Sequence, residues 1–341
     1  MNRVRVGILG LGRWGMCHLE AFSSLGTAEV VAICDSSPER LERAGKEYGV
    51  ANLISSADEL IQRDDIDLIS VVTFESHHLE PTLKALQSGK HVLVEKPVTT
   101  RPDEAKAMQE AAAVSGRLLF PGHLLRFDPR YAAIKEAVLS DRVGAPVSMY
   151  LKRSREHYLF ETFQRVHTVF ELMIHDIDLA IWYAGCRVRS VKAYGRSVTD
   201  SGAASASPEV LWANLEFENG ALAVLQSSWM TPDEAGVEIV DAIEVIGRSG
   251  IAHFETSNSG LQFWNGQGRL TPDTNIHAKL HGQSVGCLRE QLTYICRCIS
   301  RGEDPVVISF ADAVHGVEVA DAIAKSCATG REVVLAESIE L

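Results

Sequence analysis

The sequence predicts an α/β domain with a doubly wound parallel sheet over residues 1–122, followed by an α+β domain with a large open, mostly antiparallel sheet over residues 123–341. The 341 residues exceed the roughly 250 to 300 at which a single hydrophobic core stops growing. Short apolar runs alternate with helical patterns in the first part, and strand runs joined by turn signals dominate the second part.

A glycine-rich turn follows the first predicted strand. Residues 4–9 are apolar and lead directly into Gly10-x-Gly12-x-x-Gly15 and an apolar helix. Gly10 permits the tight bend, Gly12 lets the backbone approach a pyrophosphate, and Gly15 allows the helix to pack closely on the strand. Because the amino end of a helix attracts phosphates, the pattern predicts a dinucleotide site.

The second strand, EVVAICD, ends at Asp35, about 20 residues beyond Gly15, which is the spacing of an acid that binds ribose hydroxyls. A carboxylate accepts from these hydroxyls and repels a 2′-phosphate, so NAD is favoured over NADP. The alternative role of helix entry is less favoured for Asp35, because Ser37 and Pro38 already fit the N-cap and the first helical position.

The alternation continues through strands at residues 66–73 and 91–94 and a further strand in RLLFPGH, with helices between them. Strands that alternate with helices form parallel sheets, and ligands bind at the carboxyl ends of such strands. Glu95, Lys96 and Pro97 follow the strand at residues 91–94, so we predict that they line the nucleotide crevice. A lysine there can donate to a substrate hydroxyl and stabilise a developing alkoxide.

Hairpin signals mark the second domain. VLWANLEFENGALAVLQSSW alternates and turns at Asn219-Gly220, and DAIEVIGRSGIAHFE predicts a second hairpin. The uncovered face of such a sheet is a natural subunit contact. The small, polar residues 201–209 predict a mobile loop.

Composition excludes several classes of protein. A net charge of −12 argues against a nucleic-acid partner, and no apolar run reaches the roughly 20 residues of a membrane span. Seven cysteines without a CxxC pattern fit reduced thiols in a cytoplasmic protein. Cys296 and Cys298 are the only close pair and do not face each other on a helix, so no metal is predicted.

FELMIHDIDLAIWY places Glu171, His175 and Asp178 at i, i+4 and i+7, on one face of a predicted α-helix. Acids one turn before and after a histidine can orient its imidazole as a catalytic base. A solvent-exposed ionic face is the alternative, which the apolar residues around this helix disfavour.

Together, GLGRWGxxH, VEKP and HDID resemble the Gfo/Idh/MocA family (glucose-fructose oxidoreductase, inositol dehydrogenase and rhizopine catabolism), over essentially the whole chain. The resemblance implies an N-terminal Rossmann domain and NAD(P)-linked chemistry on sugars and cyclitols. It also implies a homodimer or homotetramer formed through the open C-terminal sheet. Lys96 matches the family's catalytic lysine and His175 its catalytic histidine. Two departures stand out: Glu171 replaces the usual aspartate, and TFESHH lacks the usual proline and asparagine after the third strand.

The resemblance also implies binding residues. The expected cofactor contacts are Gly10, Gly12, Arg13, Trp14, Gly15, Asp35, Thr73, His78, Glu95, Lys96 and Pro97. The expected substrate contacts are Lys96, His123, Arg126, Arg153, His167 and His175, with Arg165 as a further candidate.

The sequence thus predicts an NAD-dependent oxidoreductase that acts on a ring secondary alcohol of a sugar, cyclitol or sugar derivative. Arginines 126, 153, 155 and 165 suit an anionic substrate, but a neutral cyclitol needs only hydrogen bonds, so the substrate stays open. Two alternatives remain. One is a redox-neutral glycoside hydrolase of the same fold that uses NAD, and the other is a non-catalytic sensor that binds a dinucleotide.

Overall fold

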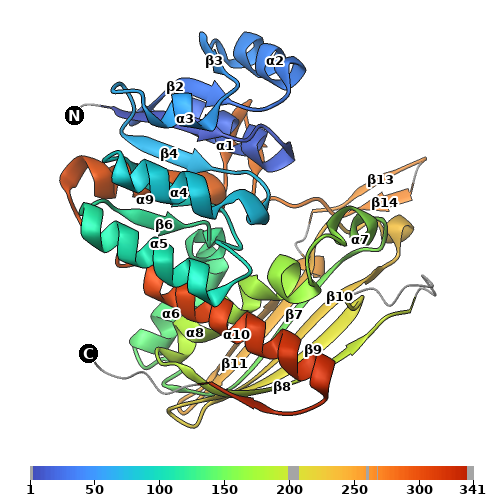
Figure 1. Cartoon of the computed structure of the whole chain (residues 1–341). Helices are drawn as coiled ribbons and strands as arrows, with labels where there is room; N and C mark the ends of the chain where they lie inside the picture. The colour runs from blue at the N-terminus through green and yellow to red at the C-terminus, as the bar shows by residue number, and fades with distance from the viewer. Residues whose placement is uncertain (1–2, 199–206, 259–260, 267, 336–341) are drawn as a thin grey trace. The chain divides into compact units, whose positions relative to one another are not determined.

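The computed structural model describes residues 3–198, 207–258, 261–266 and 268–335. These residues divide into two compact units (Figure 1). The first unit contains the chain up to Asp128 together with Thr274–Val314, and the second contains Pro129–Asp273 and the chain from His315 onward. Most of the loop predicted at residues 201–209 lies outside the described residues.

The first unit is built on a six-stranded parallel sheet with the strand order β3-β2-β1-β4-β5-β6, which confirms the predicted doubly wound sheet. Its strands are β1 (Val4–Leu9), β2 (Ala28–Cys34), β3 (Asn52–Ile54), β4 (Leu68–Val71), β5 (His91–Val94) and β6 (Leu119–Pro121). β3 was not predicted, because it has three residues and lacks an apolar run.

Helices cover both faces of this sheet (Figure 1). α1 contacts α2 and α9, whereas α4 contacts α3 and α5. α2 begins at the predicted N-cap, where the Ser37 hydroxyl accepts from the amide of Arg40. The helices are α1 (Arg13–Ser23), α2 (Pro38–Tyr48), α3 (Ala57–Ile61), α4 (Leu79–Gln87), α5 (Pro102–Ser115) and α9 (Cys287–Arg301), with the short 3₁₀-helices η1 (Glu75–His77) and η2 (Leu124–Phe127).

The chain returns to the first unit near its end. Leu288, Leu292 and Ile295 lie one turn apart on α9, are fully buried, and share a core with Leu19 and Phe22 of α1. The contact division therefore differs from the contiguous boundary expected after residue 122, because the apolar face of α9 packs on α1 and β1. This segment also carries a short hairpin, β15 (Ala278–Leu280) and β16 (Gln283–Val285).

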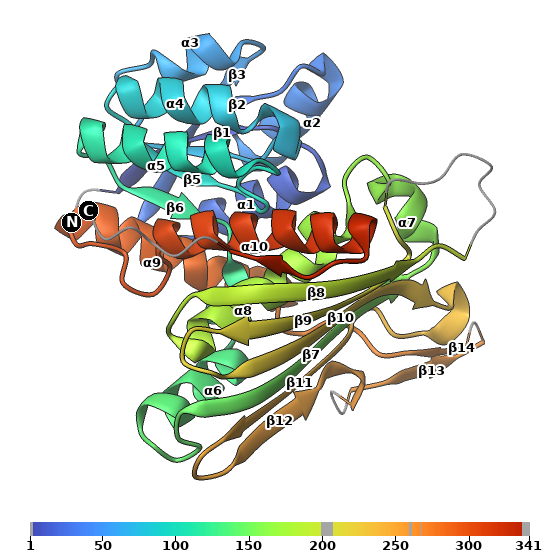
Figure 2. The ribbon, with the colours of Figure 1, turned by 60° about the horizontal axis from the view of Figure 1, so that its bottom comes forward.

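The second unit is built on a seven-stranded sheet with the order β12-β11-β7-β10-β9-β8-β17 (Figure 2). Only β7 and β10 pair in parallel, so the predicted mostly antiparallel sheet is confirmed. Both predicted hairpins are present, β9 with β10 and β11 with β12. The strands are β7 (Pro146–Glu156), β8 (Val188–Arg196), β9 (Val210–Phe217), β10 (Leu222–Thr231), β11 (Val240–Gly247), β12 (Ile251–Glu255) and β17 (Val333–Val334).

Helix α8 packs on β7 and β10, and α6 packs on α8. The remaining elements of the second unit are α6 (Pro129–Leu139), α7 (Tyr158–Phe163), the π-helix η3 (Val169–Met173), α8 (Ile174–Ala184), the part of α10 (Phe310–Thr329) after Val314, the 3₁₀-helices η4 (Asp233–Ala235) and η5 (Thr256–Asn258), and the hairpin of β13 (Phe263–Asn265) and β14 (Gly268–Leu270).

The predicted helix through Glu171, His175 and Asp178 is present, but its first turn, before His175, is a π-helix. Hydrophobic periodicity did not reveal it. Almost every residue from Val169 to Ile181 is buried, so the apolar pattern has no clear phase.

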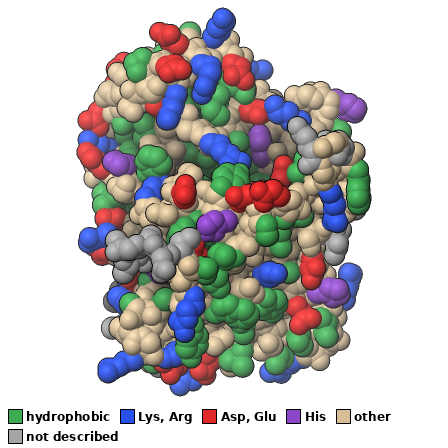
Figure 3. All heavy atoms as spheres, turned by 90° about the vertical axis from the view of Figure 1, so that its right-hand side faces the viewer, with side chains coloured by type: hydrophobic (Ala, Val, Ile, Leu, Met, Phe, Trp, Pro, Cys, Tyr) green, Lys and Arg blue, Asp and Glu red, His purple; other side chains and the backbone are tan. Residues whose placement is uncertain are grey.

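One face of the second sheet keeps its apolar side chains exposed. Along β9, Leu211, Ala213 and Leu215 are buried, whereas Trp212 is 42% exposed and lies opposite the exposed Tyr194 of β8. Figure 3 shows one side of the molecule, where hydrophobic side chains gather among charged ones.

Among the described residues, no helix has both the length and the apolarity that crossing a bilayer requires.

Leu292→Ala tests the assignment of α9 to the first unit. Truncating this fully buried side chain should cost about 2–5 kcal/mol and lower the temperature at which the first unit unfolds, followed by calorimetry. Leu225→Ala, which is equally buried in β10 of the second unit, is the matched control and should lower that temperature less. Equal effects of the two variants would contradict the assignment.

Candidate active site

The glycine turn between β1 and α1 has the geometry of a phosphate cradle. Gly10 has a φ of +97°, and a Cβ there would lie 2.6 Å from the carbonyl oxygen of Val72. A Cβ on Gly15 would lie 2.0 Å from the carbonyl oxygen of Gly10. The fold itself therefore requires both glycines.

Gly12 differs from these two. Its φ of −64° suits any residue, and a Cβ there would meet nothing within 4 Å. Neither the backbone nor the packing of the first unit requires glycine at this position. Open space above a helix N-terminus is what the close approach of a pyrophosphate needs, so the turn fits NAD.

Asp35 joins the end of β2 to this turn. Its Oδ2 accepts from the amide of Leu11 at 2.7 Å, and its Oδ1 accepts from the amide of Ser37 at 2.8 Å. The carboxylate is 8% exposed, and each oxygen keeps a further lone pair for a ribose hydroxyl. Arg13 is exposed at the start of α1. The indole Nε1 of Trp14 is buried without a hydrogen-bond partner among the described residues, and its predicted contact with the cofactor stays a prediction.

A buried carboxylate lies directly after β5. Glu95 is 4% exposed, and its Oε1 lies 3.0 Å from Nε2 of His18 in α1. Nδ1 of His18 lies 3.0 Å from the hydroxyl of Ser70 in β4. A ring that donates from Nε2 to the carboxylate accepts from this hydroxyl at Nδ1.

Burial opposes ionisation of Glu95, but the hydrogen bond from His18 and the amide of Lys96 outweigh it and hold the pKa of Glu95 below its usual range. The amide of Lys96 donates to Glu95 Oε2 at 3.0 Å. Gly122 completes the enclosure, because a Cβ there would lie 2.8 Å from the carboxylate atoms. The ionised carboxylate thus fixes the peptide from which the side chain of Lys96 extends.

Lys96 is half-buried at the carboxyl edge of the sheet and is followed by a cis peptide bond to Pro97. The ring of His78 contacts the backbone on both sides of it, at Thr73 and at Pro97. It is 1% exposed, its Nδ1 lies 3.0 Å from the carbonyl oxygen of Pro97, and its Nε2 lies 3.0 Å from that of Thr73. Burial lowers the pKa of His78, and the carbonyl oxygens that face both ring nitrogens oppose that shift. The predicted cofactor contacts of Thr73 and His78 stay predictions.

Two predicted substrate residues of the first unit lie just after Gly122. His123 is 4% exposed and precedes η2. Arg126 is 3% exposed, donates to the carbonyl oxygen of Val307 at 3.1 Å and pairs with Asp312 at 2.9 Å. The structure therefore uses the guanidinium of Arg126 to hold η2 to the segment that follows α9.

In the second unit, His167 lies before η3 and accepts from the amide of Val169 at Nδ1, 3.1 Å away. Burial lowers the pKa of His167 to about 4, so its neutral ring carries its proton on Nε2 as a hydrogen-bond donor. Glu171 in η3 and His175 in α8 are half-buried, and Asp178 is 3% exposed. His175 lies in the first turn of α8, directly after the π-helix.

Arg153 is 1% exposed, and its guanidinium bonds two carboxylates, Asp176 and Asp241. Its predicted contact with a substrate stays a prediction. Arg155 pairs with the same Asp241, and Arg165 is exposed beside the ring of Phe163.

Sequence reasoning missed the residues that hold the predicted ones in place: His18, Ser70, Asp176 and Asp241. His18 was visible as the last letter of GLGRWGMCH, an ionisable residue on an otherwise apolar helix face. Asp241 carried no local signal, because its partner Arg153 lies far away in the sequence.

Comparisons with known proteins agree with this geometry. Residues 4–123 match a family model described as an oxidoreductase family with an NAD-binding Rossmann fold, and residues 131–253 match the Gfo/Idh/MocA C-terminal domain. The chain is 28% identical to scyllo-inositol 2-dehydrogenase (NAD(+)) of Bacillus subtilis, covering 98% of this chain and 97% of that protein.

Two further proteins are similar to this chain. It is 29% identical to myo-inositol 2-dehydrogenase of Thermotoga maritima, covering 66% of this chain and 68% of that protein. Its structure superposes on scyllo-inositol dehydrogenase of Lactobacillus casei, solved with bound NAD(H) and scyllo-inositol. The TM-score is 0.84 at 22% identity, covering 98% of this chain and 99% of that chain.

Two alanine substitutions separate the roles of the glycines. Gly12→Ala should fold with a Tm within about 2 °C of the parent but weaken NADH binding at least tenfold, because the new methyl group occupies only the ligand's space. Gly15→Ala should strongly destabilise the protein, because its Cβ overlaps backbone. Calorimetry and NADH fluorescence titration measure both effects. Undiminished NADH affinity in Gly12→Ala would refute the cradle.

His18→Gln tests the buried carboxylate. Losing a hydrogen bond to a buried charge costs about 1.5–3 kcal/mol, so the apparent Tm at pH 7 should fall by several degrees, whereas Ser70→Ala should cost only about 1 kcal/mol. The pKa of Glu95 is lower in the folded chain than in the unfolded chain. The ionised carboxylate therefore contributes its full stabilisation above a pH of about 4.3, the pKa of an unfolded glutamate. This stabilisation is lost as the pH falls through the pKa of Glu95 in the folded chain. The deficit of His18→Gln should therefore shrink in acid, and a deficit that does not depend on pH would contradict the account.

Proposed function

Because this chain belongs to the Gfo/Idh/MocA oxidoreductase family, we propose that it transfers a hydride between NAD and a ring secondary alcohol of a cyclitol or a related sugar. The observation that carries the proposal is the carboxyl edge of the first sheet. There, the glycine turn that fits a pyrophosphate follows β1 and the Glu95-Lys96 segment follows β5, and only β4 lies between these two strands. A dinucleotide site next to a half-buried lysine suits alcohol oxidation better than binding alone.

Cyclitols are the favoured substrate class. Relatives named for scyllo- and myo-inositol align with this chain, the first over nearly its whole length. A neutral polyol also agrees with the arginines of the second unit, because the guanidinium of Arg153 is occupied by carboxylates. Neutral substrates need hydrogen-bond donors and acceptors, which Lys96, His123, His167 and His175 supply.

The chemistry divides between the cofactor and the chain. NAD, when bound, supplies the hydride acceptor. Lys96 donates a hydrogen bond to the substrate oxygen and stabilises the negative charge that develops there. His175 accepts the hydroxyl proton as the carbon–hydrogen bond breaks, so the alcohol becomes a ketone and one proton remains on the imidazole.

We further propose that Glu171 and Asp178 orient the imidazole of His175, and that Asp35 and Trp14 bind the cofactor. Asp35 selects NAD by repelling a 2′-phosphate. The protein acts in the cytoplasm as a homodimer or homotetramer. The exposed aromatic face of the second sheet, with Tyr194 and Trp212, supports association of subunits there.

The test is the absorbance of NADH at 340 nm when the protein and NAD meet a panel of cyclitols, aldoses, sugar acids and nucleotide sugars. A cyclitol should give the strongest signal, and Lys96→Met and His175→Asn should each lower kcat by about 10²- to 10⁴-fold. Lys106→Met, at an exposed site on α5, is the control and should retain kcat.

Two results would overturn the proposal. One is a kcat within a few-fold of the parent in folded Lys96→Met and His175→Asn. The other is the absence of NADH formation with every substrate class although NAD stabilises the protein against heat, a result that fits a redox-neutral hydrolase or a sensor.

A further inference from the structure

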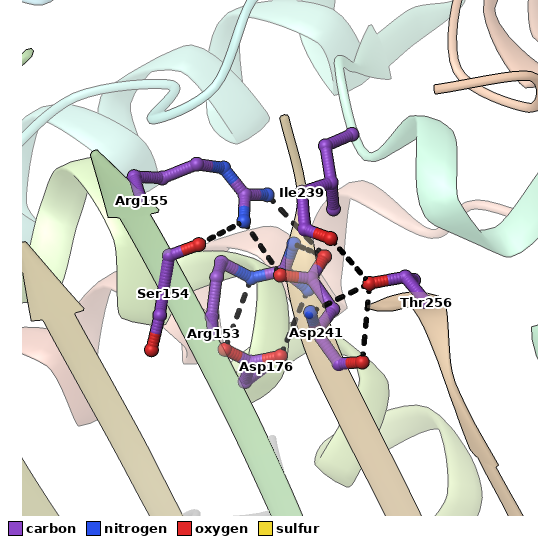
Figure 4. Close-up of polar contacts among 7 residues, drawn as sticks. All are labelled: Arg153, Ser154, Arg155, Asp176, Ile239, Asp241 and Thr256. Atoms are coloured by element: carbon purple, nitrogen blue, oxygen red, sulfur yellow. Dashed lines mark hydrogen bonds and ion pairs between the residues drawn. The ribbon is translucent and has the colours of Figure 1, made fainter. Parts of the chain in front are cut away.

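An ionic network lies buried in the second unit, beneath the first turn of α8 (Figure 4). Arg153 of β7 binds Asp176 with two parallel hydrogen bonds, Nε to Oδ2 at 3.1 Å and Nη2 to Oδ1 at 2.9 Å. Its third nitrogen, Nη1, donates to Oδ2 of Asp241 in β11 at 2.6 Å. Arg155 binds Oδ1 of Asp241 at 2.6 Å. Two arginines and two aspartates thus form one chain of contacts with balanced charge.

The network is closed to water at its centre. The side chains of Arg153, Asp176 and Asp241 are 1%, 3% and 3% exposed, and that of Arg155 is 15% exposed. Burial opposes the charge on Arg153, but Asp176 and Asp241 outweigh it and raise the pKa of the guanidinium. Burial likewise opposes ionisation of Asp241, and the two arginines outweigh it and lower the pKa of that carboxyl.

Stability alone is a weak explanation for such a cluster. Replacing buried ion pairs by packed apolar residues is often neutral or stabilising, whereas bidentate arginine–carboxylate contacts fix geometry strictly. Arg153 and Asp241 are direct cross-strand partners of β7 and β11, so the base of the network is part of the sheet itself. Thr256 secures it further, because its hydroxyl accepts from the amide of Asp241 at 2.8 Å and donates to the carbonyl oxygen of Ile239 at 2.7 Å.

Asp176 joins the first turn of α8 to this network. α8 follows a π-helix, and no side chain caps its amino end by a hydrogen bond. Asp176 is the acidic residue of the first turn and the immediate neighbour of His175. The bidentate contact with Arg153 therefore fixes the turn that carries His175 to the carboxyl-terminal part of β7.

We propose that Arg153 and Asp241, acting through Asp176, are positioning residues that set the location and orientation of the His175 imidazole. This inference rests on the proposed function, because it assumes that His175 accepts the substrate proton. The three residues are positioning and not catalytic in this account, since Arg153 and Asp241 act on the helix turn that carries both Asp176 and His175. Displacing a reacting group by about 1 Å can cost about 10²-fold in rate, so a rigid anchor here has a direct kinetic consequence.

The experiment compares Arg153→Lys and Asp176→Asn with Asp67→Asn. Lysine keeps the charge but loses the bidentate contact, and asparagine keeps the shape of Asp176 but loses its charge. Asp67→Asn breaks a bidentate arginine–aspartate pair of the first unit, with Arg5, that has no link to α8. Arg153→Lys and Asp176→Asn should lower kcat about 10- to 100-fold with KM within about threefold of the parent, whereas Asp67→Asn should retain kcat.

A second readout does not depend on activity. The protein would be labelled with ¹³C-histidine and its imidazole signals recorded by NMR. The sequence has 12 histidines, and the signal that disappears in His175→Asn is assigned to His175. It should shift or broaden in Arg153→Lys and Asp176→Asn and stay in place in Asp67→Asn. If the parent oxidises no substrate, the proposed function fails, but this signal still decides the positioning role.

Arg155→Gln serves as a further variant if Arg153→Lys and Asp176→Asn do not fold. It removes only the ion pair between Arg155, which is partly exposed, and Asp241, so it should shift the His175 signal less. An unchanged His175 signal in every folded variant of the network, together with an unchanged kcat, overturns the inference. A loss of Tm with the signal in place also overturns it, because that pattern means a purely structural network.

Discussion

The first unit depends on an ionised carboxylate that is kept away from water. Glu95 is 4% exposed, yet its oxygens are held by His18 of α1 and by the amide of Lys96, and Gly122 leaves just enough room for it. The same histidine contacts Ser70 of β4. One carboxylate thereby joins the helix that follows the glycine turn, two neighbouring strands and the peptide of the lysine. Because a buried charge without partners is costly, these elements are held in one arrangement.

The second unit also has a buried carboxylate next to a residue expected to act on the substrate. There, Asp176 is bound by Arg153 directly after His175, just as Glu95 is bound by His18 directly before Lys96. In both units the residue expected to react with substrate is adjacent in sequence to a buried carboxylate that accepts hydrogen bonds from a basic side chain. A charged neighbour with fixed partners holds the backbone at that point, while the reactive side chain remains half-buried.

Local patterns in the sequence were sufficient for most of the fold. The glycine turn, the alternation of strands with helices and the Asn219-Gly220 hairpin are each encoded within about 25 residues, and the structure contains all of them. The missed features lack a local code. β3 has only three residues, the π-helix lies within a stretch buried on all sides, and α9 returns to α1 across a large gap in sequence. The same reason explains the site: Lys96 and His175 belong to short motifs, whereas the pairing of Arg153 with Asp241 exists only once β7 and β11 lie side by side.

The most direct test of the central claim, transfer of hydride from a ring alcohol to NAD, is isotopic. The protein would be incubated with NAD and a cyclitol that carries deuterium on its carbinol carbons, and the reduced cofactor would be analysed by NMR and mass spectrometry. The account predicts one deuterium on C4 of the nicotinamide for each ketone formed, and a slower rate than with the unlabelled cyclitol if hydride transfer limits turnover. Reduced cofactor without deuterium, or ketone formed without reduced cofactor, would contradict it.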